Sequence, residues 1–192
     1  MKLSRIAMLV TVASLAFAGA AAPTLAQMQM KEQTVTVGGS PMYPSKNIIQ
    51  NAVNSKDHTT LVAAVKAAGL VETLQGRGPF TVFAPTNAAF AKLPPGTLDS
   101  LLKPEMKAKL TGVLTYHVVP GRLSAKNLTE AAKKSGGTAE FTTVEGETIS
   151  VESKGNMLMI RDAKGNASRV TIQNVFQSNG VIHVIDTVLL PS

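Results

Sequence analysis

Residues 81–94 of this 192-residue chain read TVFAPTNAAFAKLP, an apolar run that ends in a proline and continues as a helix-like stretch. Pro85 has no backbone N–H for a strand ladder, so the spacing predicts that a β-strand ends there. Thr86 is a suitable N-cap for a helix over residues 87–92. Because many folds place a nucleophile or a phosphate-binding loop where a strand turns into a helix, we first ask whether this junction carries chemistry.

The junction lacks the residues that either chemistry requires. A nucleophile elbow needs Gly-x-Ser-x-Gly, and a phosphate loop needs several glycines followed by Gly-Lys-Ser/Thr, whereas residues 84–88 read APTNA. Phe80 and Phe90 lie on either side of the bend and can both be buried. The stretch is therefore predicted to be a corner that defines the fold, with Thr86 as a helix cap.

The chain begins with a segment typical of secretory signal peptides. Lys2 and Arg5 precede an apolar core over residues 6–17, and small residues follow. We predict a signal peptide over residues 1–26 with cleavage after Ala26, and Ala20 or Ala22 as alternative sites. The apolar core is too short for a confident membrane span, and no second long apolar run follows, so we expect no membrane span in the mature chain.

The mature chain is expected to start with a flexible N-terminal extension over residues 27–44, which is rich in Gln, Gly, Ser and Pro. Residues 45–191 then have the length of one domain. Helical spacing of apolar residues predicts helices from Asn47 and from Thr59 or Thr60, the second ending at Gly69. Two further short helices are predicted over 97–102 and 104–114.

The pattern changes after residues 116–119, YHVV. Five β-rich runs, FTTV, TISVES, MLMIRD, RVTIQNVF and VIHVIDTVLL, are separated by turn residues such as Lys-Gly-Asn. A helix-rich first half and a strand-rich second half predict an α+β fold, in which helices are segregated from an antiparallel sheet.

Composition excludes some classes of chemistry. The chain has no cysteine, so neither disulfides nor zinc-thiolate sites can form. Removing the two basic residues of the signal peptide from the net charge of +7 leaves +5. The Lys and Arg residues are scattered and aromatic residues are few, which predicts a solvated basic surface rather than a nucleic-acid site. A weak preference for acidic polysaccharide or anionic lipid is the minority interpretation.

The titratable residues do not form a recognisable catalytic or metal site. His58, His117 and His183 are far apart in the sequence and show no ligand spacing. His183 alternates with apolar residues, which predicts a half-buried, hydrogen-bonded histidine. A triad could be drawn from Ser124, His117 and Asp186, but the spacing gives that choice no more support than any other. We expect no enzyme activity, no cofactor and no metal.

Three stretches taken together resemble the fasciclin (FAS1) domain family. TVFAPTNAAFAKLP resembles the first conserved block of that family, YHVVPGRL at 116–123 its central Tyr-His motif, and NGVIHVIDTVLLP at 179–191 its second conserved block. The resemblance runs from about Ser45 to Pro191, and with one domain behind a signal peptide it points to the small secreted or periplasmic fasciclin proteins of bacteria. It implies a wedge-like β-sandwich with helices packed around it, and adhesion or matrix binding rather than catalysis.

The resemblance also implies candidate binding residues. Tyr116 and His117 match a pair linked to adhesion in such domains, and Asn174 and Val175 fall where some animal relatives carry an Asp-Ile pair that binds integrin. Asn174 has no carboxylate to offer a metal ion, so integrin recognition is not carried over. Tyr116 and His117 can equally serve the core, and both alternatives stay open here.

We therefore expect an exported, non-enzymatic binding or adhesion module, periplasmic or extracellular and monomeric, that attaches to a surface or matrix protein or polysaccharide. The alternative is a carrier or sensor of a small apolar ligand in the cell envelope, held between helices and sheet. A core without an apolar cavity would count against this alternative.

Overall fold

The corner predicted for residues 81–94 is present in the computed structural model, which describes residues 34–155 and 157–192. Strand β3 (Phe80–Pro85) leads directly into helix α4 (Asn87–Ala91). The Thr86 hydroxyl accepts a hydrogen bond from the Ala89 amide at 3.2 Å, so its predicted role as an N-cap is confirmed. The predicted signal peptide and residues 27–33 lie outside the described residues, which belong to one unit, Glu32–Ser192.

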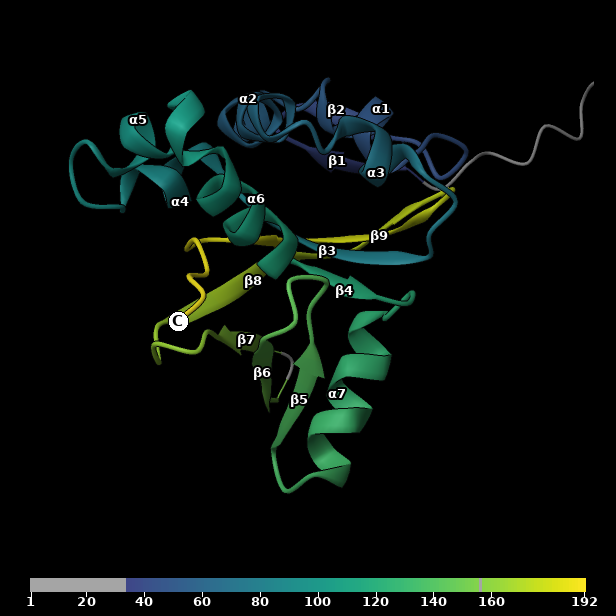
Figure 1. Ribbon diagram of the computed structural model, residues 1–192. Helices are drawn as coiled ribbons and strands as arrows, with labels where there is room; N and C mark the ends of the chain where they lie inside the picture. The colour runs from purple at the N-terminus through teal and green to yellow at the C-terminus, as the bar shows by residue number, and fades with distance from the viewer. Residues whose placement is uncertain (1–33, 156) are drawn as a thin grey trace, which may run out of the picture. The chain divides into compact units, whose positions relative to one another are not determined.

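Most helices lie on one side of β3 and β9, and α7 lies beside β5 (Figure 1). They are α1 (Ile48–Ala52), α2 (Thr59–Ala68), α3 (Val71–Gln75), α5 (Thr97–Leu101), α6 (Lys107–Tyr116) and α7 (Ala125–Lys134), with 3-10 turns η2 (Lys56–His58) and η3 (Pro104–Met106). Gly69 ends α2 with a φ of 75°, as predicted for its C-terminus. No helix of the described residues is both long and apolar enough to cross a membrane.

The strands form a hairpin and a seven-stranded sheet with the order β4-β3-β9-β8-β7-β6-β5. Besides β3 they are β1 (Val35–Val37), β2 (Ser40–Met42), β4 (Val118–Pro120), β5 (Thr138–Thr142), β6 (Thr148–Lys154), β7 (Met157–Arg161), β8 (Ala167–Gln177) and β9 (Gly180–Ile185). Within the large sheet only β3 and β9 pair in parallel.

Strand β8 divides the large sheet into two halves. Residues 167–169 of β8 pair with β7, and the residues from Val170 onward pair with β9. The β8–β9 pairing has register shifts between Val170 and Val175. Asn174 lies in this irregular stretch with a φ of 59°. Because bulges bend a strand, the two halves can fold onto each other, and residues of β3, β6, β7 and β9 share one apolar cluster between them. The predicted α+β sandwich is confirmed.

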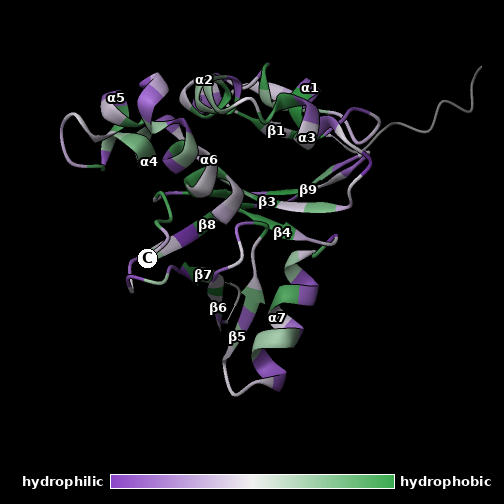
Figure 2. Ribbon diagram, viewed as in Figure 1, coloured by the Kyte–Doolittle hydropathy of each residue, from purple (hydrophilic) through white to green (hydrophobic). Residues whose placement is uncertain are grey.

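Both faces of β3 and β9 are buried. Ile182 and Val184 point to the helices α1, α2 and α6, whereas Phe83 and Ile185 point to the other half of the sheet. Figure 2 shows the resulting apolar band along β3 and β9. A strand covered on both faces needs a continuous apolar run instead of alternation, which is why 81–85 and 181–185 are so apolar in sequence.

Residues 34–44 differ from the flexible extension expected for 27–44. They form the hairpin β1–β2, which turns at Gly38 and Gly39 with φ values of 57° and 76°. Two consecutive residues with positive φ make the tight turn that fits hairpin twist. Val37 and Met42 are buried in the core between the helices and β3–β9, so the hairpin belongs to the domain.

Helix α7 was not predicted within the strand-rich second half. Ser124 caps it by accepting a hydrogen bond from the Asn127 amide, and the Asn127 side chain accepts one from the Ser124 amide in return. Leu128 and Ala132 are fully buried, and Leu128 belongs to the cluster between the two halves of the sheet. A capping box followed by alanines is the signal that identifies such a helix.

The parallel contact between β3 and β9 depends on glycine. A Cβ atom on Gly180 would overlap the Phe80 carbonyl, and one on Gly78 would overlap the Asn179 carbonyl. Asn179 also fixes this end of the sheet, because its side chain accepts a hydrogen bond from Ile48 and donates to Leu74 at 2.8 Å. The two strands therefore approach each other where no side chain fits.

We expect Gly180→Ala to lower the free energy of unfolding by about 2 kcal/mol or more, because the added methyl group forces β9 away from β3. Urea titration followed by circular dichroism measures this. The matched control is Gly112→Ala in α6, where a Cβ atom meets nothing within 4 Å. That change should stabilise the helix by about 0.5–1 kcal/mol. Equal stability of the two variants would contradict the assigned role of Gly180.

Candidate functional site

Tyr116 lies at the last position of α6, and its side chain is fully buried. Its hydroxyl donates a hydrogen bond to the Thr148 carbonyl at 2.9 Å and accepts one from the Ala163 amide at 2.9 Å. These bonds connect α6 with the start of β6 and with the turn after β7. Tyr116 thus joins a helix of the first half of the chain to the strands of the second half.

His117 is buried directly after α6. Its Nδ1 lies 2.7 Å from the Val113 carbonyl, and its Nε2 lies 3.0 Å from the Leu189 amide. These partners require Nδ1 to carry the proton and Nε2 to accept, so the ring is neutral. Burial lowers the pKa of His117 to about 4. The imidazole therefore links α6 to the segment after β9 as an uncharged group.

Asn174 and Val175 form part of the bend in β8. The Asn174 side-chain oxygen accepts a hydrogen bond of 2.7 Å from the Ala125 amide at the start of α7, and its own amide lies 3.4 Å from Nδ1 of His183. Val175 is 1% exposed. Asparagine tolerates the positive φ found here and adds a second hydrogen-bond acceptor at the α7 N-terminus.

The four residues implied by the resemblance thus have internal roles and do not form one exposed patch. Tyr116 and His117 join α6 to later segments, whereas Asn174 and Val175 shape the bend beside α7. No hydrogen bond joins the two pairs in the described part of the chain. A direct contact of these residues with a partner stays a prediction.

The three histidines do not share a hydrogen-bond partner in the described part of the chain. His183 is fully buried, more so than predicted, with its Nε2 2.9 Å from the Leu123 carbonyl and its ring stacked on Phe83. His58 contacts the Ser55 hydroxyl through Nδ1 at 2.9 Å, while its Nε2 has no hydrogen-bond partner among the described residues. Within the described ranges no three His, Asp or Glu residues gather as a metal site.

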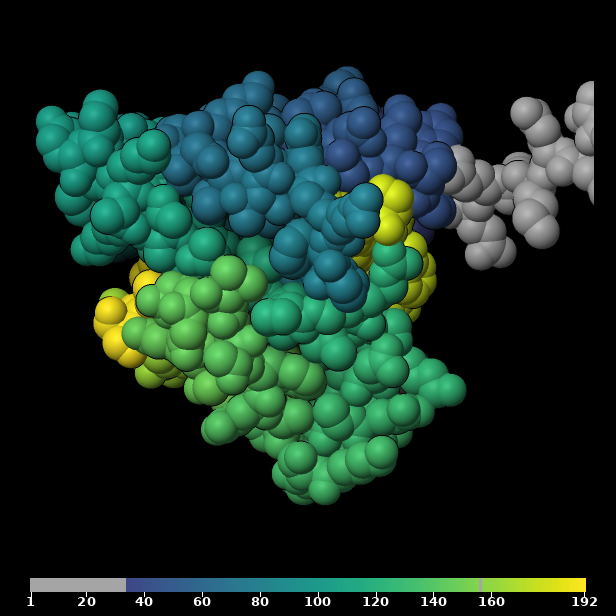
Figure 3. Space-filling view, turned by 45° about the vertical axis from the view of Figure 1, so that its right-hand side comes forward, coloured from purple at the N-terminus to yellow at the C-terminus, as the bar shows by residue number. Residues whose placement is uncertain are grey.

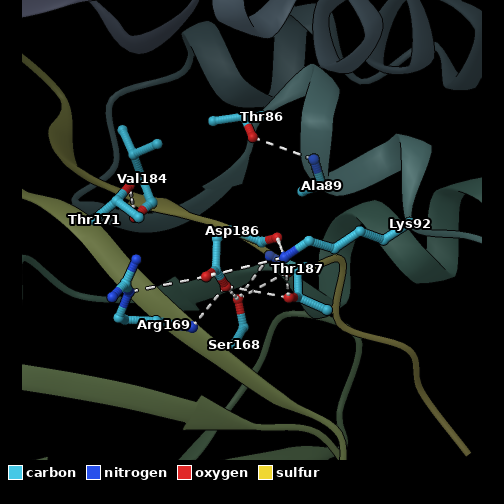
Figure 4. Close-up of polar contacts among 9 residues, drawn as sticks. All are labelled: Thr86, Ala89, Lys92, Ser168, Arg169, Thr171, Val184, Asp186 and Thr187. Carbon is cyan, nitrogen blue, oxygen red and sulfur yellow. Dashed lines mark hydrogen bonds and ion pairs between the residues drawn. The ribbon is translucent and has the colours of Figure 1, made fainter.

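Asp186 is the centre of a polar cluster at the end of β9 (Figure 4). Its carboxylate accepts a hydrogen bond from the Arg169 amide at 2.9 Å and lies 4.0 Å from the Lys92 ammonium. Partial burial would raise the pKa of Asp186, but hydrogen bonds from Arg169 and Thr187, together with the charges of Lys92 and Arg169, hold that pKa below its usual value. The cluster ties the end of α4 to β8 and β9 beside the Thr86 cap.

The structure has a small apolar cavity between the helices and β3–β9. Its volume is about 50 Å³, and its lining includes Met42, His58, Leu61 and Ile182. An engineered apolar cavity that binds benzene measures about 150 Å³, so this one fits only a few heavy atoms. The cavity exists, as the carrier alternative requires, but its size does not favour that function.

A larger, open groove of about 690 Å³ lies beside α6. Its walls come from α5 and α6, from the turn at residues 145–147, from Lys164, and from residues 190–192. In Figure 3 the α5–α6 segment and the C-terminal residues lie on either side of an indentation. Sequence reasoning missed this groove because four separate segments build it. The one local signal is Gly112 in the interior of a helix.

We expect Tyr116→Phe to lower the free energy of unfolding by about 1–3 kcal/mol, because the Thr148 carbonyl and the Ala163 amide both lose their buried partner. Urea titration measures the change. The control is Tyr43→Phe, since the Tyr43 hydroxyl makes no hydrogen bond to the described part of the chain. A Tyr116→Phe protein with unchanged stability would contradict the structural role.

We also expect acid to destabilise the domain through His117. The pKa in the folded state, about 4, lies below the unfolded value of 6.5, so only the unfolded chain gains a proton between these values. Stability is complete above pH 6.5 and falls by about 2 kcal/mol by pH 5. His117→Gln should lose less stability over the same interval, which urea titrations at several pH values measure. A variant with the wild-type pH dependence would contradict this assignment.

Comparison with known proteins agrees with this architecture. The fasciclin domain model matches residues 56–191. The chain is 45% identical to Protein sll1483 of Synechocystis, over 87% of this chain and 86% of that protein, and 40% identical to Immunogenic protein MPB70 of Mycobacterium bovis, over 73% of this chain and 66% of the relative.

A domain pair of the insect cell adhesion molecule fasciclin I has the same fold. It superposes with a TM-score of 0.70 at 21% identity, over 77% of this chain and 52% of the solved one. Three findings agree with the resemblance seen in the sequence. They are the family model that matches most of the chain, the bacterial relatives and the shared fold. The chain belongs to the fasciclin (FAS1) domain family.

Proposed function

We propose that this protein is an exported, non-enzymatic binding module that attaches to a cell-surface or matrix component through a shallow face. The observation that carries the proposal is the open groove beside α6, with a volume of about 690 Å³ against about 50 Å³ for the apolar cavity. An open groove can bind one segment of a large polymer or protein while the rest of that molecule stays outside. The solved relative is described as a cell adhesion molecule, which supports the same role here.

The positive net charge of the protein favours binding to acidic partners. The expected mature chain carries a net charge of +5, and most of its lysines are exposed. Long-range attraction between a basic domain and an acidic polymer weakens as salt rises, because ions screen exposed charges. The signal peptide predicted from the sequence supports a location in the periplasm or outside the cell, where such polymers occur.

The test is retention of the mature chain, residues 27–192, on envelope and matrix fractions of the source cells. We expect retention at about 0.01 M salt and progressive release towards about 1 M, where the screening length falls to about 3 Å. An unrelated monomeric domain of the same net charge is the control for charge alone. Retention no better than that of the control would refute the binding function, and salt-insensitive retention would refute its electrostatic part.

A further inference from the structure

We propose that the groove beside α6 binds a short stretch of acidic polysaccharide, in which carboxylate groups of uronic-acid sugars pair with Lys109 and Lys164. This inference rests on the proposed binding function and assigns a ligand class to the groove. Both lysines are exposed and line the groove, and neither forms an ion pair within the described ranges. They can therefore turn towards a bound anion without breaking a contact.

The two carboxylates of the groove favour a ligand that carries hydrogen-bond donors besides its acidic groups. Glu145 accepts a hydrogen bond from the Glu147 amide at 3.2 Å, and Glu147 accepts two from Ser192, from its amide at 2.9 Å and its hydroxyl at 3.0 Å. An acidic peptide would bring further carboxylates and only its backbone N–H groups as donors. A uronic-acid chain also brings hydroxyl groups, which can donate to the remaining carboxylate lone pairs.

The rest of the lining also suits a sugar. Thr97 and Ser100 line the groove, and their hydroxyls make no hydrogen bond to the described part of the protein, so they can donate to or accept from sugar hydroxyls. Met106, Leu190 and Pro191 supply apolar surface between these polar groups. Sugar rings present both C–H faces and hydroxyl edges, and the mixed lining is complementary to both.

Gly112 leaves part of the α6 backbone uncovered in the groove. Glycine is one of the least favourable residues in a helix interior, yet Gly112 lies inside α6 and lines the groove. Its φ is not positive, and a Cβ atom would meet nothing within 4 Å, so neither backbone conformation nor packing requires glycine. The missing side chain leaves the helix backbone open to a ligand.

The test uses the full mature chain and tetragalacturonate as the probe, titrated by calorimetry at about 0.01 M salt, where screening extends over about 30 Å. The fully methyl-esterified tetramer and a tetraglutamate peptide are the comparison ligands. We expect binding of tetragalacturonate and at least about tenfold weaker binding of both others, since each lacks either the carboxylates or the hydroxyls. Equal binding of tetraglutamate would overturn the sugar assignment in favour of an acidic peptide.

Two pairs of variants locate the site. Lys109→Gln with Lys164→Gln should weaken tetragalacturonate binding about tenfold, since two ion pairs are lost. Lys133→Gln with Lys134→Gln changes the net charge equally but at the end of α7, outside the groove lining, and should leave binding within about twofold. If both double variants lose affinity for tetragalacturonate equally, the lysines act through the net charge of the protein, and the groove is not the binding site.

Gly112→Gln should weaken binding by a similar factor by filling the groove, while Gly112→Ala should retain most of it. Urea titration checks that both proteins are folded. If wild-type protein is retained on the envelope fractions but does not bind tetragalacturonate, this inference fails and the binding function stands. If Gly112→Gln folds and binds as wild type, the groove is not the site.

Discussion

The parallel pairing of β3 with β9 is the contact on which the domain depends. It joins Phe80 to Gly180, a hundred positions apart in the chain, and places both strands where helices cover one face and the second half of the sheet covers the other. Such pairing needs close approach of the two backbones, which the glycines at 78 and 180 allow. The most apolar stretches of the sequence are those that this double burial requires.

Buried polar side chains connect α6, α7 and the later strands with one another around the β3–β9 pair. Tyr116 and His117 join α6 to the later strands and to the segment after β9, and Asn174 joins the bend of β8 to α7. Replacing any of them removes a hydrogen bond inside the domain. Loss of binding in such variants is therefore informative only when the variant protein is shown to be folded. The open groove beside α6 offers surface residues that can be changed without this difficulty.

Local signals in the sequence predicted local structure well. The strand end at Pro85, the cap at Thr86 and the helix end at Gly69 follow from backbone chemistry within a few residues, and each is found as predicted. The hairpin β1–β2 was missed because its polar, glycine-containing sequence resembles a tail unless the burial of Val37 and Met42 is known. Four distant segments form the groove, and their meeting depends on the register of the whole sheet.

The place of β9 in the sheet has a consequence for the order in which the chain becomes structured. β9 follows all the other described strands along the chain, yet it lies between β3 and β8. Until it emerges from the ribosome, β3 lacks its parallel neighbour and the helices lack the side chains of Ile182 and Val184. Contacts of such long sequence separation form slowly. A nascent chain of this protein therefore stays incompletely folded until β9 has been synthesised.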